Sequence, residues 1–225
     1  MSATPGPAAP PTPATTLAGR RLYLCTPDRP DLAHFLGACI TGGVDVVQLR
    51  DKQLDARSTV DRARVAKRVC ADLGVPFILN DRPDLALEAG ADGVHVGQDD
   101  VSPTTARRIV GPDALIGLST HAPEELRRSR DEPVDYVSAG PVTPTPTKPG
   151  RPGTGTEYIA YAAQHARHPV FVTGGVTPDT VPAMAGAGAR HFVVVRYLTD
   201  APDPEQAARR LRDAVDEYTP EGQGP

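Results

Sequence analysis

The sequence has little cysteine, and its few cysteines are not arranged for metal binding or cross-linking. The 225-residue chain contains three, Cys25, Cys39 and Cys70, an odd number without a C-x-x-C pair. Neither a zinc site nor a full disulfide framework is therefore indicated. The compartment that we expect is a reducing cytoplasm.

Long apolar runs and a strong excess of one charge are also missing. No stretch of about 18 apolar residues occurs, which argues against a membrane-spanning helix. The N-terminus lacks the charged and apolar segments of a signal peptide. The net charge is −4, so nothing draws the whole chain to nucleic acid. We expect small-molecule partners, neither nucleic acid nor membrane, and the sequence is compatible with a homo-oligomer.

The two ends of the chain differ in composition from the rest. Residues 1–18 are rich in proline, alanine and threonine, with only scattered apolar side chains that could join a core. We expect a disordered tail there and a second disordered segment at 220–225. Residues 19–219 are then expected to form one folded catalytic domain.

Short apolar runs alternate with longer helical patterns from residue 21 onward. The clearest helix is 55–73, for which Asp55 can serve as N-cap and Gly74 can end the last turn. Other helices are expected to begin near Leu32, Leu85, Pro103, Pro123, Thr156, Pro178 and Pro204. The runs that we predict as strands are 22–25, 44–49, 76–79, 93–96, 115–118, 136–139, 170–173 and 192–195.

These eight strand and helix units predict the fold. Apolar strands separated by helical segments are typical of parallel pairing through crossover helices. Eight such units in about 200 residues favour a closed barrel over an open sheet. We therefore predict an α/β protein with a single (β/α)8 TIM barrel, whose chemistry would lie at the carboxyl ends of the strands.

The end of the second predicted strand carries cations. Gln48, Arg50 and Lys52 alternate along the chain and should therefore face the same side. Two cations and an amide aimed into one mouth suggest an anion of high charge, such as a diphosphate. The alternative is a solvated strand end with salt bridges to Asp51 or Asp55.

Carboxylates follow the next two predicted strands. Asp81 comes after the third and Asp100 after the fourth. Mg²⁺ typically takes one or two protein carboxylates, so this pair predicts a magnesium site, with Asp99 the less favoured neighbour. Asp100 could instead cap the following helix. His95, inside the fourth strand, is expected to be a hydrogen-bonded core group rather than a catalyst.

Ser119 and His121 follow the fifth predicted strand and suggest a nucleophile and base. No acid is evidently placed to orient His121, and the G-x-S-x-G elbow is absent, so a hydrolase triad is not favoured. We predict that the Ser119 hydroxyl donates to a ligand. A helix-start serine is the alternative.

Two later segments are suited to phosphate. Gly174 and Gly175 follow the seventh strand and Arg196 follows the eighth, where barrels of this kind commonly bind phosphate. The proline-rich loop G-P-V-T-P-T-P-T-K-P-G at 140–150 contributes hydroxyls and Lys148. One cationic site for a diphosphate and one site for a monophosphate predict an enzyme that joins a diphosphate-bearing electrophile to a phosphorylated acceptor.

Six motifs, in this order, resemble thiamine-phosphate synthase, also called thiamine phosphate pyrophosphorylase. The similarity spans roughly residues 21–198. The motifs are Q-L-R-D-K at 48–52, N-D-R at 80–82, D-G-V-H-V-G-Q-D-D at 92–100, G-L-S-T-H at 117–121, G-P-V-T-P-T-P-T-K at 140–148 and G-G-V at 174–176.

This resemblance implies a transferase of thiamine biosynthesis. It would couple 4-amino-5-hydroxymethyl-2-methylpyrimidine diphosphate to 4-methyl-5-(2-phosphoethyl)thiazole, giving thiamine monophosphate and diphosphate. By similarity, Mg²⁺ would be held by Asp81 and Asp100. The pyrimidine diphosphate would be bound by Gln48, Leu49, Arg50, Asp51, Lys52, Asn80, Ser119 and Lys148. The thiazole phosphate would lie near Thr145, Pro146, Thr147, Gly175, Val195 and Arg196.

One position departs from the pattern, because Arg196 stands where several members have a serine after the valines of strand eight. The expected reaction is a dissociative loss of diphosphate, with Arg50, Lys52, Lys148 and Ser119 as the catalytic candidates. Two alternatives are a thiazole tautomerase-like isomerase of the same fold and a non-catalytic protein that binds thiamine precursors. The first would not need the cluster of cations and carboxylates.

Overall fold

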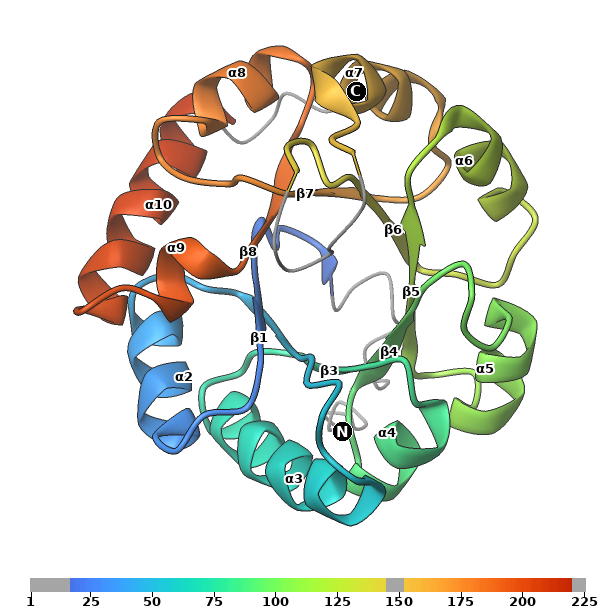
Figure 1. Cartoon of the computed structure of the whole chain (residues 1–225), viewed down its shortest axis with the longest axis vertical. Helices are drawn as coiled ribbons and strands as arrows, with labels where there is room; N and C mark the ends of the chain where they lie inside the picture. The colour runs from blue at the N-terminus through green and yellow to red at the C-terminus, as the bar shows by residue number, and fades with distance from the viewer. Residues whose placement is uncertain (1–16, 145–151, 220–225) are drawn as a thin grey trace, which may run out of the picture.

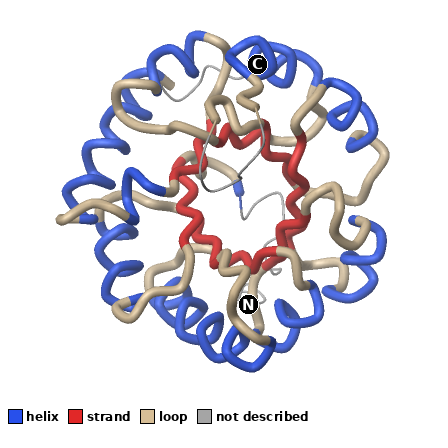
Figure 2. The backbone as a smooth tube through the Cα atoms, viewed as in Figure 1, coloured by secondary structure: helices blue, strands red, loops and turns tan. Residues whose placement is uncertain are grey.

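The barrel that the sequence predicts is present. The computed structural model describes residues 17–144 and 152–219. Within them, eight parallel strands pair in sequence order, and β8 pairs with β1 to close the barrel. Figures 1 and 2 show the strands as an inner ring surrounded by helices. This confirms the single (β/α)8 TIM barrel.

The strands lie within two residues of their predicted bounds. They are β1 Leu22–Thr26, β2 Val46–Leu49, β3 Phe77–Asn80, β4 Gly93–Val96, β5 Leu115–Thr120, β6 Tyr136–Ala139, β7 Val170–Thr173 and β8 His191–Val194. The largest extension is at β5, because Ser119 and Thr120 remain paired with β6. This pairing fixes Ser119 on a strand at the barrel mouth.

The helices follow the predicted order, with one addition. They are α2 Leu32–Thr41, α3 Ala56–Asp72, α4 Pro83–Ala89, α5 Pro103–Val110, α6 Pro123–Ser129, α7 Gly155–His165, α8 Val181–Gly186, α9 Arg196–Thr199 and α10 Pro204–Tyr218. Asp55 caps α3 by accepting from the backbone N–H of Ser58 at 2.8 Å, as predicted. The addition is α9, which starts at Arg196. None of the helices in the described ranges is both long and apolar enough to cross a membrane.

The core has two layers because side chains alternate along each strand. The outer layer fills the space between strands and helices. The inner layer lies inside the barrel and includes the rings of Tyr23, Tyr136 and Phe171. Leu17 belongs to this inner cluster and is 6% exposed. Among the described residues, packing into the barrel interior therefore starts with Leu17.

Three aspartates fasten the strand starts. Asp45, Asp92 and Asp135 each stand just before or at the entry to a strand, and each accepts a backbone N–H from the strand before it. Their basic partners are Arg212, Lys67 and Arg107, respectively. These clamps lie at the end of the barrel opposite the carboxyl ends of the strands, where TIM barrels commonly carry stability rather than chemistry.

Candidate active site

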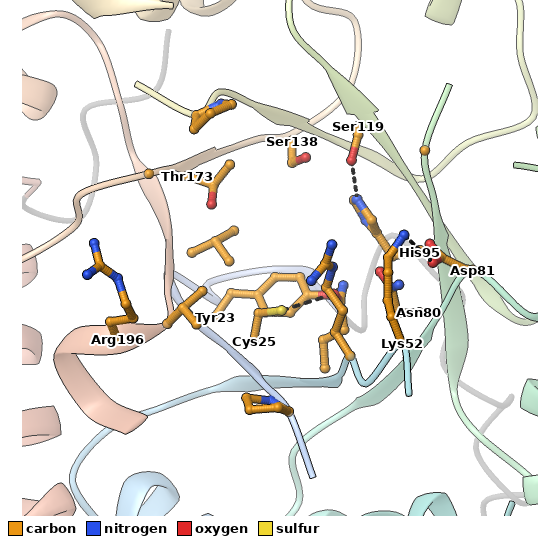
Figure 3. A pocket seen from close by; sticks show the side chains of 18 of the residues that line it. Tyr23, Cys25, Lys52, Asn80, Asp81, His95, Ser119, Ser138, Thr173 and Arg196 are labelled. Atoms are coloured by element: carbon orange, nitrogen blue, oxygen red, sulfur yellow. Dashed lines mark hydrogen bonds and ion pairs between the residues drawn. The ribbon is translucent and has the colours of Figure 1, made fainter. Parts of the chain in front are cut away.

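A cavity of about 1060 Å³ opens at the carboxyl ends of the strands (Figure 3). It is the place where chemistry occurs in barrels of this class. The expected site residues that line it are Gln48, Arg50, Asp51, Lys52, Asn80, Asp81, Asp100, Ser119, Gly175, Val195 and Arg196. Side chains from both halves of the chain therefore meet in one space.

Leu49 is the described site candidate that does not line the cavity. Its side chain is 1% exposed and belongs to the outer core, because the alternation that turns Gln48 inward turns Leu49 toward the helices. A contact from Leu49 to a ligand would have to come from its backbone. The candidates Thr145, Pro146, Thr147 and Lys148 lie outside the described residues.

Lys52, Asp81 and Asp100 form a charged cluster on one side of the cavity. The Lys52 Nζ lies 3.1 Å from an Asp81 carboxylate oxygen. Burial raises the pKa of Asp81, and the neighbouring Asp100 carboxylate raises it further, while Lys52 lowers it. The partner of Lys52 is therefore Asp81, and not Asp51 or Asp55 as the alternative had it.

Asp100 is not the cap of the following helix. Ser102 caps α5 by accepting from the backbone N–H of Thr105 at 3.2 Å. One carboxylate oxygen of Asp100 accepts from the backbone N–H of Gly97 at 2.7 Å. This bond holds Asp100 beside Asp81 at the cavity. Among the described residues, no group of three or more His, Cys, Asp or Glu side chains could hold a metal, so any ion here would rest on this carboxylate pair.

The floor of the cavity is a chain of hydrogen-bonded side chains from five strands. His95 bridges Ser119 Oγ at 2.9 Å and the Tyr136 hydroxyl at 3.1 Å. The Tyr136 and Tyr23 hydroxyls lie 3.0 Å apart, and Gln48 donates to Tyr23 at 2.7 Å. Cys25 Sγ donates to the Gln48 carbonyl at 3.2 Å. His95 is thus a hydrogen-bonded core group, as expected. Figure 3 shows its ring beneath Ser119.

Gly117 makes room for this chain. A Cβ at that position would overlap the Tyr136 ring and the Nδ1 atom of His95. The glycine of the G-L-S-T-H motif therefore leaves space for the hydrogen bond between His95 on β4 and Tyr136 on β6. The sequence does not reveal this requirement.

An acid does orient His121, and the expectation that none is placed to do so was wrong. The Glu125 carboxylate accepts from the backbone N–H of His121 at 2.7 Å and lies 2.8 Å from its Nδ1. The two are four residues apart across the start of α6, where sequence alone gives little indication of contact. The hydroxyl of Ser119, however, lies 2.9 Å from Nε2 of a different histidine, His95.

The opposite side of the cavity is built from the loops after β6, β7 and β8. Gly174 and Gly175 have φ angles of 100° and 79°, in the region that favours glycine. A Cβ on Gly175 would overlap Thr143 Oγ1, so the two loops pack closely. Arg196 lies across the cavity from Lys52 and Asp81 (Figure 3).

The expected anion loop is fastened at both described ends. The backbone N–H of Val142 donates to Thr173 at 2.8 Å, and that of Thr154 donates to Pro141 at 2.8 Å. Pro141 lines the cavity. Val142 is therefore held at the end of β7, and Thr154 is held against Pro141.

Several cavity residues were not among the predicted candidates. Tyr23, Cys25, Ser138 and Thr173 line the cavity, and Gln98 donates from its amide to the Ser119 carbonyl at 2.7 Å. Alternation along β1 does place Tyr23 and Cys25 on the same inward face. A polar residue among apolar strand neighbours was the signal that could have identified them.

A (β/α)8 barrel with cations and paired carboxylates on one side of its mouth, and glycines and an arginine on the other, defines an enzyme that handles anionic, phosphorylated small molecules. The family model described as thiamine monophosphate synthase matches residues 22–198. The chain belongs to the thiamine monophosphate synthase family and is an enzyme.

Named relatives agree with this assignment. The thiamine-phosphate synthase of Thermus thermophilus is 48% identical over 87% of this chain and 97% of its own. That of Thermobifida fusca is 47% identical over 87% of this chain and 92% of its own. The solved thiamine phosphate pyrophosphorylase from Pyrococcus furiosus has a TM-score of 0.82 at 26% identity, covering 91% of this chain and 98% of that one.

Proposed function

We propose that this enzyme joins 4-amino-5-hydroxymethyl-2-methylpyrimidine diphosphate to 4-methyl-5-(2-phosphoethyl)thiazole, releasing diphosphate and forming thiamine monophosphate. One observation carries the proposal. A single cavity of about 1060 Å³ has a cluster of cations and carboxylates on one side and a glycine and arginine region on the other. Two phosphorylated substrates that must react with each other need such a shared space.

The diphosphate would lie on the side of Arg50 and Lys52. Their cationic groups can stabilise the negative charge that grows on a departing diphosphate. Asn80, Ser119 and the Gln48 side chain offer hydrogen bonds, while Leu49 and Asp51 would contribute through their backbone. Lys148 would add a third cation.

Mg²⁺ would be held by Asp81 and Asp100. The fit rests on two hard carboxylates placed side by side, with the pKa of Asp81 raised by burial and by Asp100. A divalent cation relieves this repulsion and takes few protein ligands. When bound, it would supply further charge stabilisation to the leaving diphosphate.

The thiazole phosphate would lie on the side of Gly175 and Arg196. Glycine at a positive φ brings backbone N–H groups close to a ligand, and the arginine adds a positive charge. Val195, Thr145, Pro146 and Thr147 would complete this side. Arg196 would thus offer a guanidinium group in place of a serine hydroxyl, while the backbone N–H at this position is unchanged.

The reaction needs no protein nucleophile or base. The bond between the pyrimidine methylene and the diphosphate oxygen breaks, and its electron pair leaves with the diphosphate. The lone pair of the thiazole nitrogen forms the new bond to the methylene, so no proton is transferred. The residues of this chain bind, orient and stabilise charge.

Identification of the product tests this proposal. Incubation of the full chain with both substrates and Mg²⁺ should yield a compound with the mass of thiamine monophosphate. Binding of both substrates without product would identify a non-catalytic binding protein. Isomerisation of a thiazole substrate with no pyrimidine present would identify a tautomerase instead.

A further inference from the structure

The hydrogen-bonded side chains beneath the cavity begin at Cys25 and end at Ser119, and only Gln48 and Ser119 among them have a role in the proposed reaction. Tyr23, His95 and Tyr136, which link them, are each at most 7% exposed. A buried chain of polar groups in a barrel interior is costly unless each donor meets an acceptor. Each hydroxyl or ring N–H in this chain must therefore point at the acceptor atom of its neighbour.

The two tyrosines can each donate only once. Burial raises the pKa of both Tyr23 and Tyr136 well above the ordinary value, so each phenol keeps its single proton at neutral pH. A phenol that donates to one neighbour must accept from the other. A direction set at one end of the chain is thus passed to the next residue.

Cys25 sets that direction. Its thiol donates to the carbonyl oxygen of Gln48 at 3.2 Å, which turns the amide nitrogen toward Tyr23. If the Gln48 amide were flipped, its N–H groups would face the Cys25 sulfur, which is a weak acceptor. Tyr23 accepts from Gln48, and its own buried hydrogen needs an acceptor, which the Tyr136 hydroxyl 3.0 Å away supplies.

The direction continues to the cavity. Tyr136 accepts from Tyr23 and so donates to Nδ1 of His95 at 3.1 Å. The imidazole then carries its hydrogen on Nε2 and donates it to Ser119 Oγ at 2.9 Å. Since Ser119 accepts from below, its own hydroxyl hydrogen is left to donate into the cavity that the residue lines.

We infer that His95, held in its Nε2–H tautomer by Tyr136, Tyr23 and Gln48, is a positioning residue that keeps Ser119 a hydrogen-bond donor toward a diphosphate oxygen. This role rests on the proposed function. Diphosphate oxygens only accept hydrogen bonds. If Ser119 donated its hydrogen to His95 instead, its oxygen lone pairs would face the substrate anion and repel it. A donor aimed where charge grows acts in the transition state.

The tautomer of His95 tests the inference directly in the free protein. Nitrogen-15 NMR distinguishes the protonated from the unprotonated ring nitrogen, and the His95→Gln spectrum assigns the signal among the six histidines of the chain. The expected result is hydrogen on Nε2. Hydrogen on Nδ1 would overturn the inference.

Two substitutions of His95 form a matched pair. Glutamine can place an amide N–H where Nε2 lies, whereas asparagine reaches only the position of Nδ1. We expect His95→Gln to keep most of the turnover and His95→Asn to lower kcat by about tenfold or more, with a smaller change in KM for the pyrimidine diphosphate. Equal losses in two variants with equal melting temperatures would contradict the inference.

Tyr136→Phe breaks the chain one step below His95. It should lower kcat about tenfold and leave the His95 tautomers mixed in the NMR spectrum. Tyr158→Phe is its control, because the Tyr158 hydroxyl is also largely buried but donates to the Ala122 carbonyl outside the cavity lining. That variant should keep wild-type kcat and the wild-type tautomer.

These results separate the inference from the proposed function. If the wild-type chain makes no thiamine monophosphate, the proposed function fails, whatever the tautomer. If it makes thiamine monophosphate while His95 carries its hydrogen on Nδ1, the function stands and the inference fails.

Discussion

Lys52 is one of the cations at the mouth whose loss should affect chemistry and leave folding intact. Its side chain is 58% exposed and pairs with Asp81 at the surface of the cavity. Exposed ion pairs contribute only about 0–1 kcal/mol to stability. A lysine that stabilises a leaving diphosphate, in contrast, contributes several times more in the transition state.

We therefore expect Lys52→Ala to lower kcat by about a factor of 10² and to leave the unfolding free energy within about 1 kcal/mol of wild type. Steady-state diphosphate release and urea titration measure the two effects. Arg68→Ala, on the exposed face of α3, removes a positive charge away from the cavity and should change neither. An unchanged kcat for Lys52→Ala would exclude its role at the leaving group.

Contacts between individual side chains are also what the sequence did not predict. The prediction that Gln48, Arg50 and Lys52 share one cavity agrees with the structure, although β2 ends at Leu49 and Asp51 lines the cavity as well. The contact from Glu125 to His121 and the need for glycine at position 117 depend on side-chain positions across a helix start or on neighbouring strands. Such contacts have no periodic signature in a single sequence.

At the scale of the elements, the aspartates at the starts of the strands contribute to stability and lie away from the cavity where the reaction would occur. The Asp92 carboxylate accepts the backbone N–H of Phe77 at 2.8 Å and pairs with Lys67. It thereby joins β3 to the start of β4 at the end of the barrel away from the cavity. Removing it leaves a strand N–H without its partner.

Asp92→Ala should consequently lower the unfolding free energy by about 1–3 kcal/mol. Its kcat should remain that of wild type at temperatures where it is folded. Denaturant unfolding gives the first value and turnover at 25 °C or below the second. Asp72→Ala, an exposed residue at the end of α3, should stay within about 0.5 kcal/mol. Equal stability of the Asp92 and Asp72 variants would rule out the clamp.

The loops after β6 and β7 pack against each other, and disturbing this contact should affect substrate binding. Gly175 combines a φ of 79° with close contact to Thr143. Gly175→Ala should raise KM for the thiazole phosphate about tenfold, because a side chain there forces the two loops apart. Gly37→Ala is the control, since a Cβ on this glycine inside α2 would meet no other atom within 4 Å. It should leave KM unchanged, and an unchanged KM for both would remove Gly175 from the site.

The whole molecule was the scale at which the sequence was most informative. Eight apolar runs separated by helical patterns determine a closed barrel, because crossover helices and parallel strands leave few other arrangements. The strand ends then had to meet at one mouth. The sequence did not indicate the short helix α9 or the burial of Leu17 in the inner core, which depends on the closed barrel around it.

For the molecule as a whole, we propose that the two sides of the cavity hold two substrates that react with each other. The most direct measurement is diphosphate release from the full chain with Mg²⁺, with both substrates and with each omitted, alongside the thiamine monophosphate formed. We predict release only when both substrates are present, in equal amounts with the product, and its loss when a chelator removes Mg²⁺. Release of diphosphate from the pyrimidine substrate alone at the same rate, or no release with both, would contradict the account.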